Sequence, residues 1–162
     1  MWRQVVSVNI VGSIKVDMKP VQQIMKQLGV TAQGDVQKFH TANVRRRIQR
    51  YMPYRSGATI KLMIIQSPAD QPFIHVDVPY AHYLYKGKVW VDPATHAAGF
   101  LTANGWRSRK DVPKVETDRD IEYDKTKNPE AGPYWDRRLV AAEGAQMQAD
   151  LQAYVDRRAG SS

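Results

Sequence analysis

The chain has 162 residues, of which 43% are hydrophobic and 25% are charged, a balance typical of one globular domain. It contains no cysteine, which excludes disulfides, thiolate metal sites and cysteine nucleophiles and is typical of assembly in a reducing cytosol. No apolar run approaches the roughly 20 residues of a membrane-spanning helix. The formal net charge of +8 favours nucleic acid or an acidic protein surface as a partner. A basic surface that is only solvated and binds nothing specific is the alternative.

Hydrophobic residues alternate with mostly polar ones from Val6 to Val16, which predicts a half-buried strand bent at Gly12. The residues before it lack the long apolar stretch of a signal peptide. A short helix should follow from Asp17 and end at Gly29, with an apolar stripe of Val21, Ile24, Met25 and Leu28.

A second helix is predicted from Asp35, as its N-cap, to about Tyr51. One core-facing side follows the helical spacing of Val36, Phe39, Val44, Ile48 and Tyr51. Pro53 prevents continuation of the helix, and Tyr54 to Gly57 are typical of a turn.

Two strands are expected next, Thr59 to Gln66 and Phe73 to Val78, joined as a hairpin through residues 67 to 72. Pro79 then starts a short helical turn that Gly87 ends, and Lys88 to Val91 predicts another strand.

Residues 92 to 132 carry few aliphatic side chains, so we expect a loose, functional excursion with one strand-like piece, Ile121 to Asp124. A final helix should run from Trp135 to about Arg158. The whole order predicts an α+β fold: a small antiparallel sheet with helices packed on one face, plus a long extended excursion before a C-terminal helix. We expect one domain over residues 1 to 162, with its core in about residues 5 to 91 and 133 to 158.

No pattern in the sequence nominates a catalytic or metal site. The histidines are scattered and never take ligand spacing, so each is interpreted as structural: His40, His75, His82 and His96. The acidic group Asp118, Asp120, Glu122 and Asp124 is interrupted by Arg119 and lacks the calcium-loop pattern, which favours a solvated loop. Because nucleophile and phosphate-binding motifs are also missing, we expect no enzyme activity, no metal and no cofactor.

Basic residues form two clusters, each beside an aromatic residue, Tyr51 or Trp106. The first is Arg45, Arg46, Arg47 and Arg50, and the second is Arg107, Arg109 and Lys110. Such groups are candidates for contact with the phosphates of a DNA channel or with an acidic partner, without base reading.

Three short motifs, each at the boundary of a predicted element, occur in a fixed order. They are Pro53-Tyr54-Arg55-Ser56-Gly57, then Pro79-Tyr80-Ala81 with Tyr85 to Gly87, then Pro133-Tyr134-Trp135. In this order, over about residues 36 to 158, the chain resembles a minor capsid family of tailed phages that is close to neck and tail-completion proteins.

The resemblance implies a virion component made in the bacterial cytoplasm, which forms a ring of about six or twelve copies at the head–tail junction. Its implied partners are itself, the portal or adaptor, and the head-closure or tail-terminator proteins, with non-specific contact to packaged DNA and none to a membrane. The implied structural or interface residues are Pro53, Tyr54, Gly57, Pro79, Tyr80, Ala81, Tyr85, Gly87 and Trp135. Their physical chemistry permits both core packing and subunit contact, because tyrosines bury a ring and keep the hydroxyl wet.

Two other functions stay open. A non-specific nucleic-acid-binding protein would use the basic clusters, and its binding would collapse as salt rises. A small hydrolase or toxin-like enzyme would depend on acid–base residues that converge only in the fold.

Overall fold

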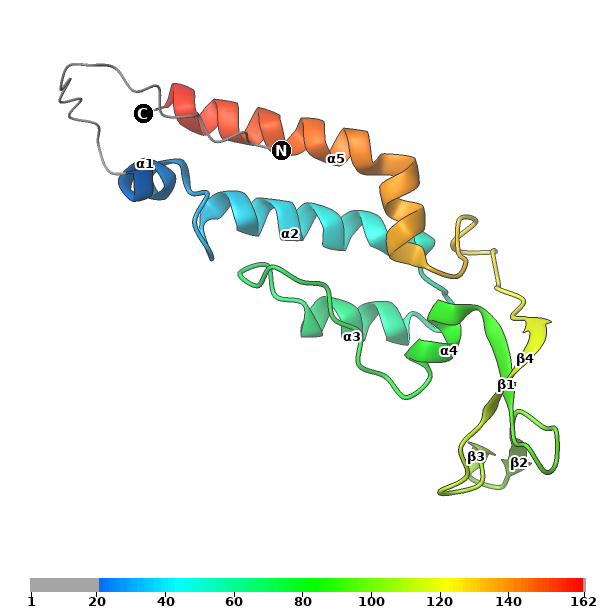
Figure 1. Cartoon of the computed structure of the whole chain (residues 1–162). Helices are drawn as coiled ribbons and strands as arrows, with labels where there is room; N and C mark the ends of the chain where they lie inside the picture. Colours follow the sequence, from blue (N-terminus) through cyan, green and yellow to red (C-terminus); the bar gives the residue numbers. More distant parts are fainter. Residues whose placement is uncertain (1–20, 162) are drawn as a thin grey trace, which may run out of the picture.

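The computed structural model describes residues 21 to 161 (Figure 1). Its helices are α1 (Val21–Leu28), α2 (Asp35–Ile48) with the 3-10 turn η1 (Gln49–Tyr51), α3 (Ala58–Gln66), α4 (Ala81–Lys86) and α5 (Trp135–Gly160). Its strands are β1 (Lys88–Val91), β2 (Phe100–Thr102), β3 (Gly105–Arg107) and β4 (Val115–Asp120). The fold is therefore α+β, as predicted, while the predicted strand of residues 6 to 16 lies outside the described residues.

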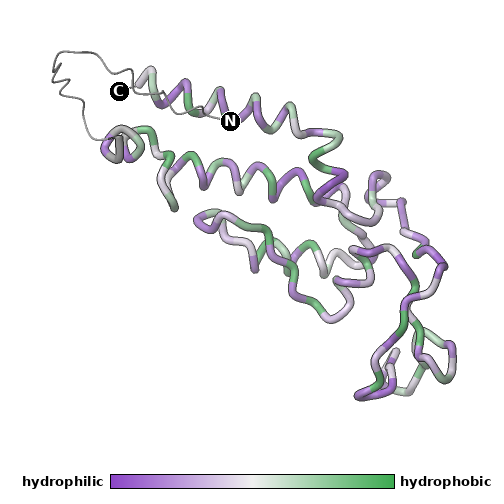
Figure 2. The backbone as a smooth tube through the Cα atoms, in the orientation of Figure 1, coloured by the Kyte–Doolittle hydropathy of each residue, from purple (hydrophilic) through white to green (hydrophobic). Residues whose placement is uncertain are grey.

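The helices stack on one another, with α5 along one side of α2 and α3 beyond the other (Figure 1). Hydrophilic and hydrophobic positions alternate along α2 and α5, as expected where each helix buries one side (Figure 2). The buried core consists of Ile48, Tyr51, Met52, Ile60, Met63, Trp135, Leu139 and Met147. Farther along the α2–α5 contact, the rings of Phe39 and Tyr154 stack with centroids 4.3 Å apart.

The predicted helix from Asp35 to Tyr51 is confirmed, but its N-cap residue is Gly34. Asp35 is the first helical residue instead, and its carboxylate forms an ion pair of 2.9 Å with Arg158 of α5. That pair ties the start of α2 to the end of α5, and the negative charge suits the positive end of the helix dipole.

The predicted strand from Thr59 to Gln66 is wrong, because this segment forms helix α3. Alternation of Ile60, Leu62 and Ile64 suggested a strand, but the buried side chains are Thr59, Ile60, Met63 and Ser67, which follow helical spacing. Gly57 precedes α3 with φ of 78°, in the left-handed region. This turn lets α3 start at Ala58, shortly after Pro53 has ended the helical segment before it. A short apolar run cannot distinguish the two structures by periodicity alone.

The predicted hairpin is also wrong, because Phe73 to Val78 forms no strand and belongs to neither sheet. Side chains from the end of α3 take the place of a partner strand. The Ser67 hydroxyl bonds both backbone groups of His75, and the Gln66 amide bonds both backbone groups of Asp77. Ile74, Val76 and Val78 still alternate toward the interior, so the period of two was meaningful.

Strands β1 and β4 form one antiparallel ladder, and β2 and β3 form a separate hairpin. We call residues 88 to 120 the β arm; it extends from α4, away from the helical stack (Figure 1). The predicted excursion is thus structured, and its long strand is Val115–Asp120, whereas Ile121 to Asp124 form no strand. Within residues 21 to 161, no helix is both long and apolar enough to cross a membrane.

Candidate interaction surface

The second and third motifs meet around Tyr85 of α4. Its ring lies edge-on to the rings of Tyr134 and Trp135, with both pairs of centroids 5.1 Å apart. Its hydroxyl donates to the Asp136 carboxylate at 2.9 Å, and its carbonyl accepts from the Tyr134 amide at 2.9 Å. Burial and the bond to Asp136 raise the pKa of Tyr85. These contacts fix α4 to the start of α5.

Gly87 allows the β arm to leave this junction. Its φ is 75°, and a Cβ at this position would lie 2.7 Å from Cβ of Pro133. Its carbonyl accepts from the Ile121 amide at 2.8 Å, where the chain returns from the arm. The Tyr123 hydroxyl donates to the Leu84 carbonyl at 2.6 Å, and burial together with the charge of Asp120 raises the pKa of Tyr123 to about 12. Both chain segments of the arm are therefore held at the same point.

The first motif lies on the other side of α4. The ring of Tyr54 packs on Gly57, 3.2 Å from where a Cβ would stand. Pro53, Gly57 and Tyr80 line a hollow of about 530 Å³, and Tyr80 is 43% exposed there. Ala81 lines a second hollow with Tyr85 and Trp135, and Pro79 lines the groove below the arm. The three motifs thus surround one helix, although they are far apart in the sequence.

The first basic cluster is largely engaged within the chain. Arg45 donates to the Ser67 carbonyl at 2.9 Å, and Arg46 donates to the Asn43 side chain at 2.9 Å. Arg47 is nearly buried and pairs with both Glu143 and Asp150 of α5. Arg50 is about half exposed and forms an ion pair of 3.2 Å with Glu143. Arg46 and Arg50 are thus the exposed residues of the first basic cluster.

Glu143 is the important residue that the sequence analysis missed. It is buried at the centre of the α2–α5 contact, where Tyr51 donates to it at 2.8 Å. The signal was present, because Trp135, Leu139, Glu143 and Met147 follow one another at four-residue spacing and all are buried. A carboxylate in an otherwise apolar series indicates a buried polar partner.

The two carboxylates of this network remain ionised. Burial opposes the charge of Glu143, but hydrogen bonds from Tyr51 and Arg47 outweigh it, so its pKa is lowered. Side-chain bonds from Gln146, Asn43 and Arg47 lower the pKa of Asp150 to about 2. The network is therefore a charged link between α2 and α5, not a pair of groups that exchange protons near neutral pH.

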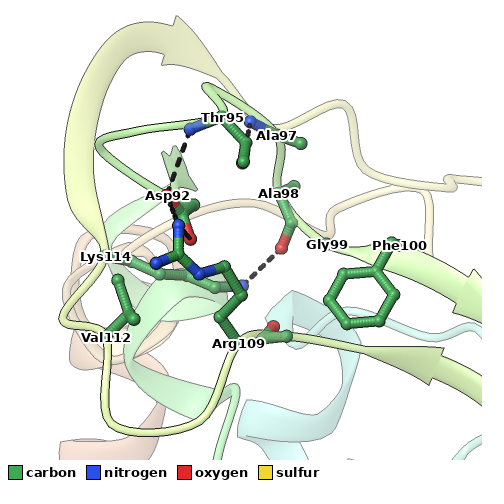
Figure 3. A pocket seen from close by; sticks show the side chains of 10 residues that line it. Asp92, Thr95, Ala97, Ala98, Gly99, Phe100, Arg109, Val112 and Lys114 are labelled. Atoms are coloured by element: carbon green, nitrogen blue, oxygen red, sulfur yellow. Dashed lines mark hydrogen bonds and ion pairs between the residues drawn. The ribbon is translucent and has the colours of Figure 1, made fainter.

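The second basic cluster lies in the β arm, where Arg107, Arg109 and Lys110 are all exposed. Arg109 reaches back to the buried Asp92 at 3.3 Å, as Figure 3 shows. Asp92 also accepts from the amides of Ala94 and Thr95, and these bonds, the Ala94 bond above all, lower its pKa.

Arg109 and Asp92 border a small, mainly apolar pocket of about 130 Å³ (Figure 3). Lys114 donates to the Ala98 carbonyl at 2.5 Å across the same pocket. Arg109 and Lys114 are thus bonded to the loop between β1 and β2. They fix the segment between β3 and β4 against the loop that follows β1.

The tip of the arm exposes large apolar side chains. Leu101 and Trp106 stand opposite each other in the hairpin, and they are 76% and 61% exposed. Phe100 of the same hairpin and Val115 at the start of β4 are about half exposed. An exposed apolar pair such as Leu101 and Trp106, with basic residues nearby in the chain, is typical of a surface that another molecule covers.

The histidines and the acidic residues of segment 118 to 124 do not form a common site in the described part of the chain. His82 lies edge-on to Trp90, with centroids 5.4 Å apart, and His75 is held through its backbone. Asp120 forms an ion pair of 2.6 Å with Lys88 across the β1–β4 ladder. In the described part of the chain, no three histidine or acidic side chains cluster closely enough to hold a metal ion.

Comparison of the chain with protein-family models, with curated proteins and with solved structures gave no match. Any assignment of function therefore depends on the motifs around α4 and on the exposed surface of the β arm.

Proposed function

We propose that the chain is a structural subunit of a tailed-bacteriophage particle: a minor capsid or neck protein that forms a ring at the head–tail junction. The observation that carries the proposal is the convergence of the three motifs around α4, at the point where the β arm leaves the helical stack. Residues shared with the resembling family would be expected to meet in space if they serve one structural role.

The shape of the protein supports an assembly role. A helical stack closed by the Arg47–Glu143 link forms the base, and the arm carries two strongly exposed apolar side chains, Leu101 and Trp106, away from that base. Monomeric proteins seldom leave such residues clustered and uncovered. The arm then contacts another copy or a neighbouring portal, adaptor, head-closure or tail-terminator protein.

The charge supports the same location. With Arg47 engaged inside the fold, the exposed cations of the arm are the better candidates to face packaged DNA or an acidic partner: Arg107 and Lys110, with Arg109 beside them. These contacts would be independent of base sequence. The role is structural and involves no catalysis.

The direct test is to purify particles from cells that carry the gene and to search them for this chain by mass spectrometry. Deletion of the gene should yield DNA-filled heads and free tails that do not join, seen by electron microscopy. If the chain is missing from the particles, or if its deletion leaves joined particles at normal yield, the proposal is wrong.

One observation favours the alternative, a non-specific nucleic-acid-binding protein. Arg107 and Lys110 are exposed and follow the exposed Trp106 closely in the chain, and an aromatic ring near cations suits a single-stranded nucleic acid. Fluorescence anisotropy with a labelled oligonucleotide would then show binding that weakens steeply with salt and is lost in Arg107→Ala/Lys110→Ala. Binding that is equally strong in this variant would exclude the arm as the nucleic-acid surface.

A further inference from the structure

We propose that β3 of one copy of this chain adds to the open edge of β4 in a second copy. The inference rests on the proposed function, because it names the contact through which the subunits of the ring associate.

Both strands have an edge available. Each sheet has two strands, so within residues 21 to 161 β4 has a ladder partner only on the β1 side and β3 only on the β2 side. The open side of such a strand presents amide and carbonyl groups that can pair with another strand. A two-stranded ribbon is also marginally stable by itself, so both sheets would gain from an added strand.

The side chains of the two edges are complementary in charge. Successive residues of a strand point to opposite faces, so β3 presents Trp106 on one face and Arg107 on the other. Strand β4 carries three carboxylates, Glu116, Asp118 and Asp120, and its register against β1 shifts between Glu116 and Asp120, so its side chains do not follow a strict alternation. Pairing thus places the cation of Arg107 beside a strand rich in carboxylates, a favourable cross-strand combination.

Charge selects this partner over others. Residues 105 to 110 of the β3 edge carry Arg107, Arg109 and Lys110 and no acidic residue, whereas β4 carries three acidic residues and one arginine. Among the ion pairs of the described chain, none involves Arg107, Glu116 or Asp118, and all three are exposed. These charges are therefore accessible to a second copy.

The two edges do not pair within one chain. The connection from β3 to β4 is held away by the bonds of Arg109 to Asp92 and of Lys114 to the Ala98 carbonyl, and the strands lie in separate sheets. Because the contact joins two different strands, each copy uses β3 toward one neighbour and β4 toward the other. Such a heterologous contact, repeated, closes a ring or extends a filament.

Charge reversal tests the contact in the full-length chain. Sedimentation velocity over a protein concentration series at low salt should show self-association of the wild type. Arg107→Glu, or Glu116→Arg with Asp118→Arg, should each weaken association by about tenfold or more, because attraction at the opposed pairs becomes repulsion. The chain carrying all three changes should associate like the wild type, since every contact again joins opposite charges. Lys127→Glu, an exposed position outside the arm, is the matched control and should change nothing.

Cysteine pairing adds a second measurement, because the chain has no cysteine of its own. Under mild oxidation, Arg107→Cys mixed with Glu116→Cys should give covalent dimers, and neither variant should do so alone. A wild type that stays monomeric, association that ignores charge reversal, or dimers formed by Arg107→Cys alone would each overturn the edge pairing. None of these outcomes depends on finding the chain in phage particles, so failure of the contact and failure of the proposed function are separable.

Discussion

Replacement of the Glu143 carboxylate by an apolar side chain should destabilise the protein strongly. Glu143→Leu leaves the Tyr51 hydroxyl without its acceptor and leaves Arg47, nearly buried, with Asp150 as its remaining carboxylate. Breaking a buried ion pair from one side costs about 3–5 kcal/mol, and we expect about 3 kcal/mol here because Arg47 keeps Asp150. That is a large share of the roughly 5–15 kcal/mol by which a domain is stable.

The assay is urea unfolding followed by circular dichroism, with the free energy of unfolding taken from each curve. Arg47→Met/Glu143→Leu should cost clearly less than the two single changes added together, and Tyr51→Phe should recover part of the remainder by removing the unpaired hydroxyl. A loss below about 1 kcal/mol in Glu143→Leu, or strict additivity of the two changes, would refute the view that the link is buried and cooperative.

Three further outcomes are expected. Tyr123→Phe should lower stability by about 1 kcal/mol in urea unfolding, because the bond to the Leu84 carbonyl is lost. A pKa raised to about 12 contributes stability below about pH 10 that disappears as the pH rises through 12, so this variant should also lose less stability than the wild type over that window. The pKa of Asp150, lowered to about 2, contributes stability above about pH 4 that is lost as the pH falls through 2; Asp150→Asn should therefore show a flatter acid limb, and an unchanged slope would contradict the assignment. Gly87→Ala should lower the melting temperature, because the left-handed φ and the approach of Pro133 both oppose a Cβ; an equal or higher value would mean that the junction can open.

The long helices were predictable from the sequence because their spacing spans several turns. The helix over residues 35 to 51, the final helix, and the stop at Gly87 all agree with the structure. Helix α3 was not predictable in the same way, since nine residues contain too few turns to separate a period of 3.6 from a period of two. In the arm, the strand Lys88–Val91 was predicted and is confirmed, whereas the other three strands were not predicted, because β4 is almost entirely polar and β2 and β3 have three residues each.

The candidate interaction surface, too, was only partly predictable from the sequence. The order of the motifs is visible in the sequence, but the contact of Tyr85 with Trp135 joins positions that only the tertiary fold brings together. The two basic clusters look alike in the sequence, yet one is bonded to α5 and the other is exposed on the arm. Only the positions of Glu143 and Asp150 distinguish them, because a cation's role is set by the carboxylates that the fold places beside it.

The link between Arg47 and Glu143 joins positions 96 residues apart, and the whole arm lies between them. During synthesis, α2 therefore leaves the ribosome long before its partner helix exists, and its apolar side must wait uncovered while α3, α4 and the arm are made. Among the described helices, α5 is translated after all the others, and it is the one that covers α2. A chain cut before Trp135 would thus keep every strand of the arm but lack the helix that closes the base, so the base can form only after α5 has been made.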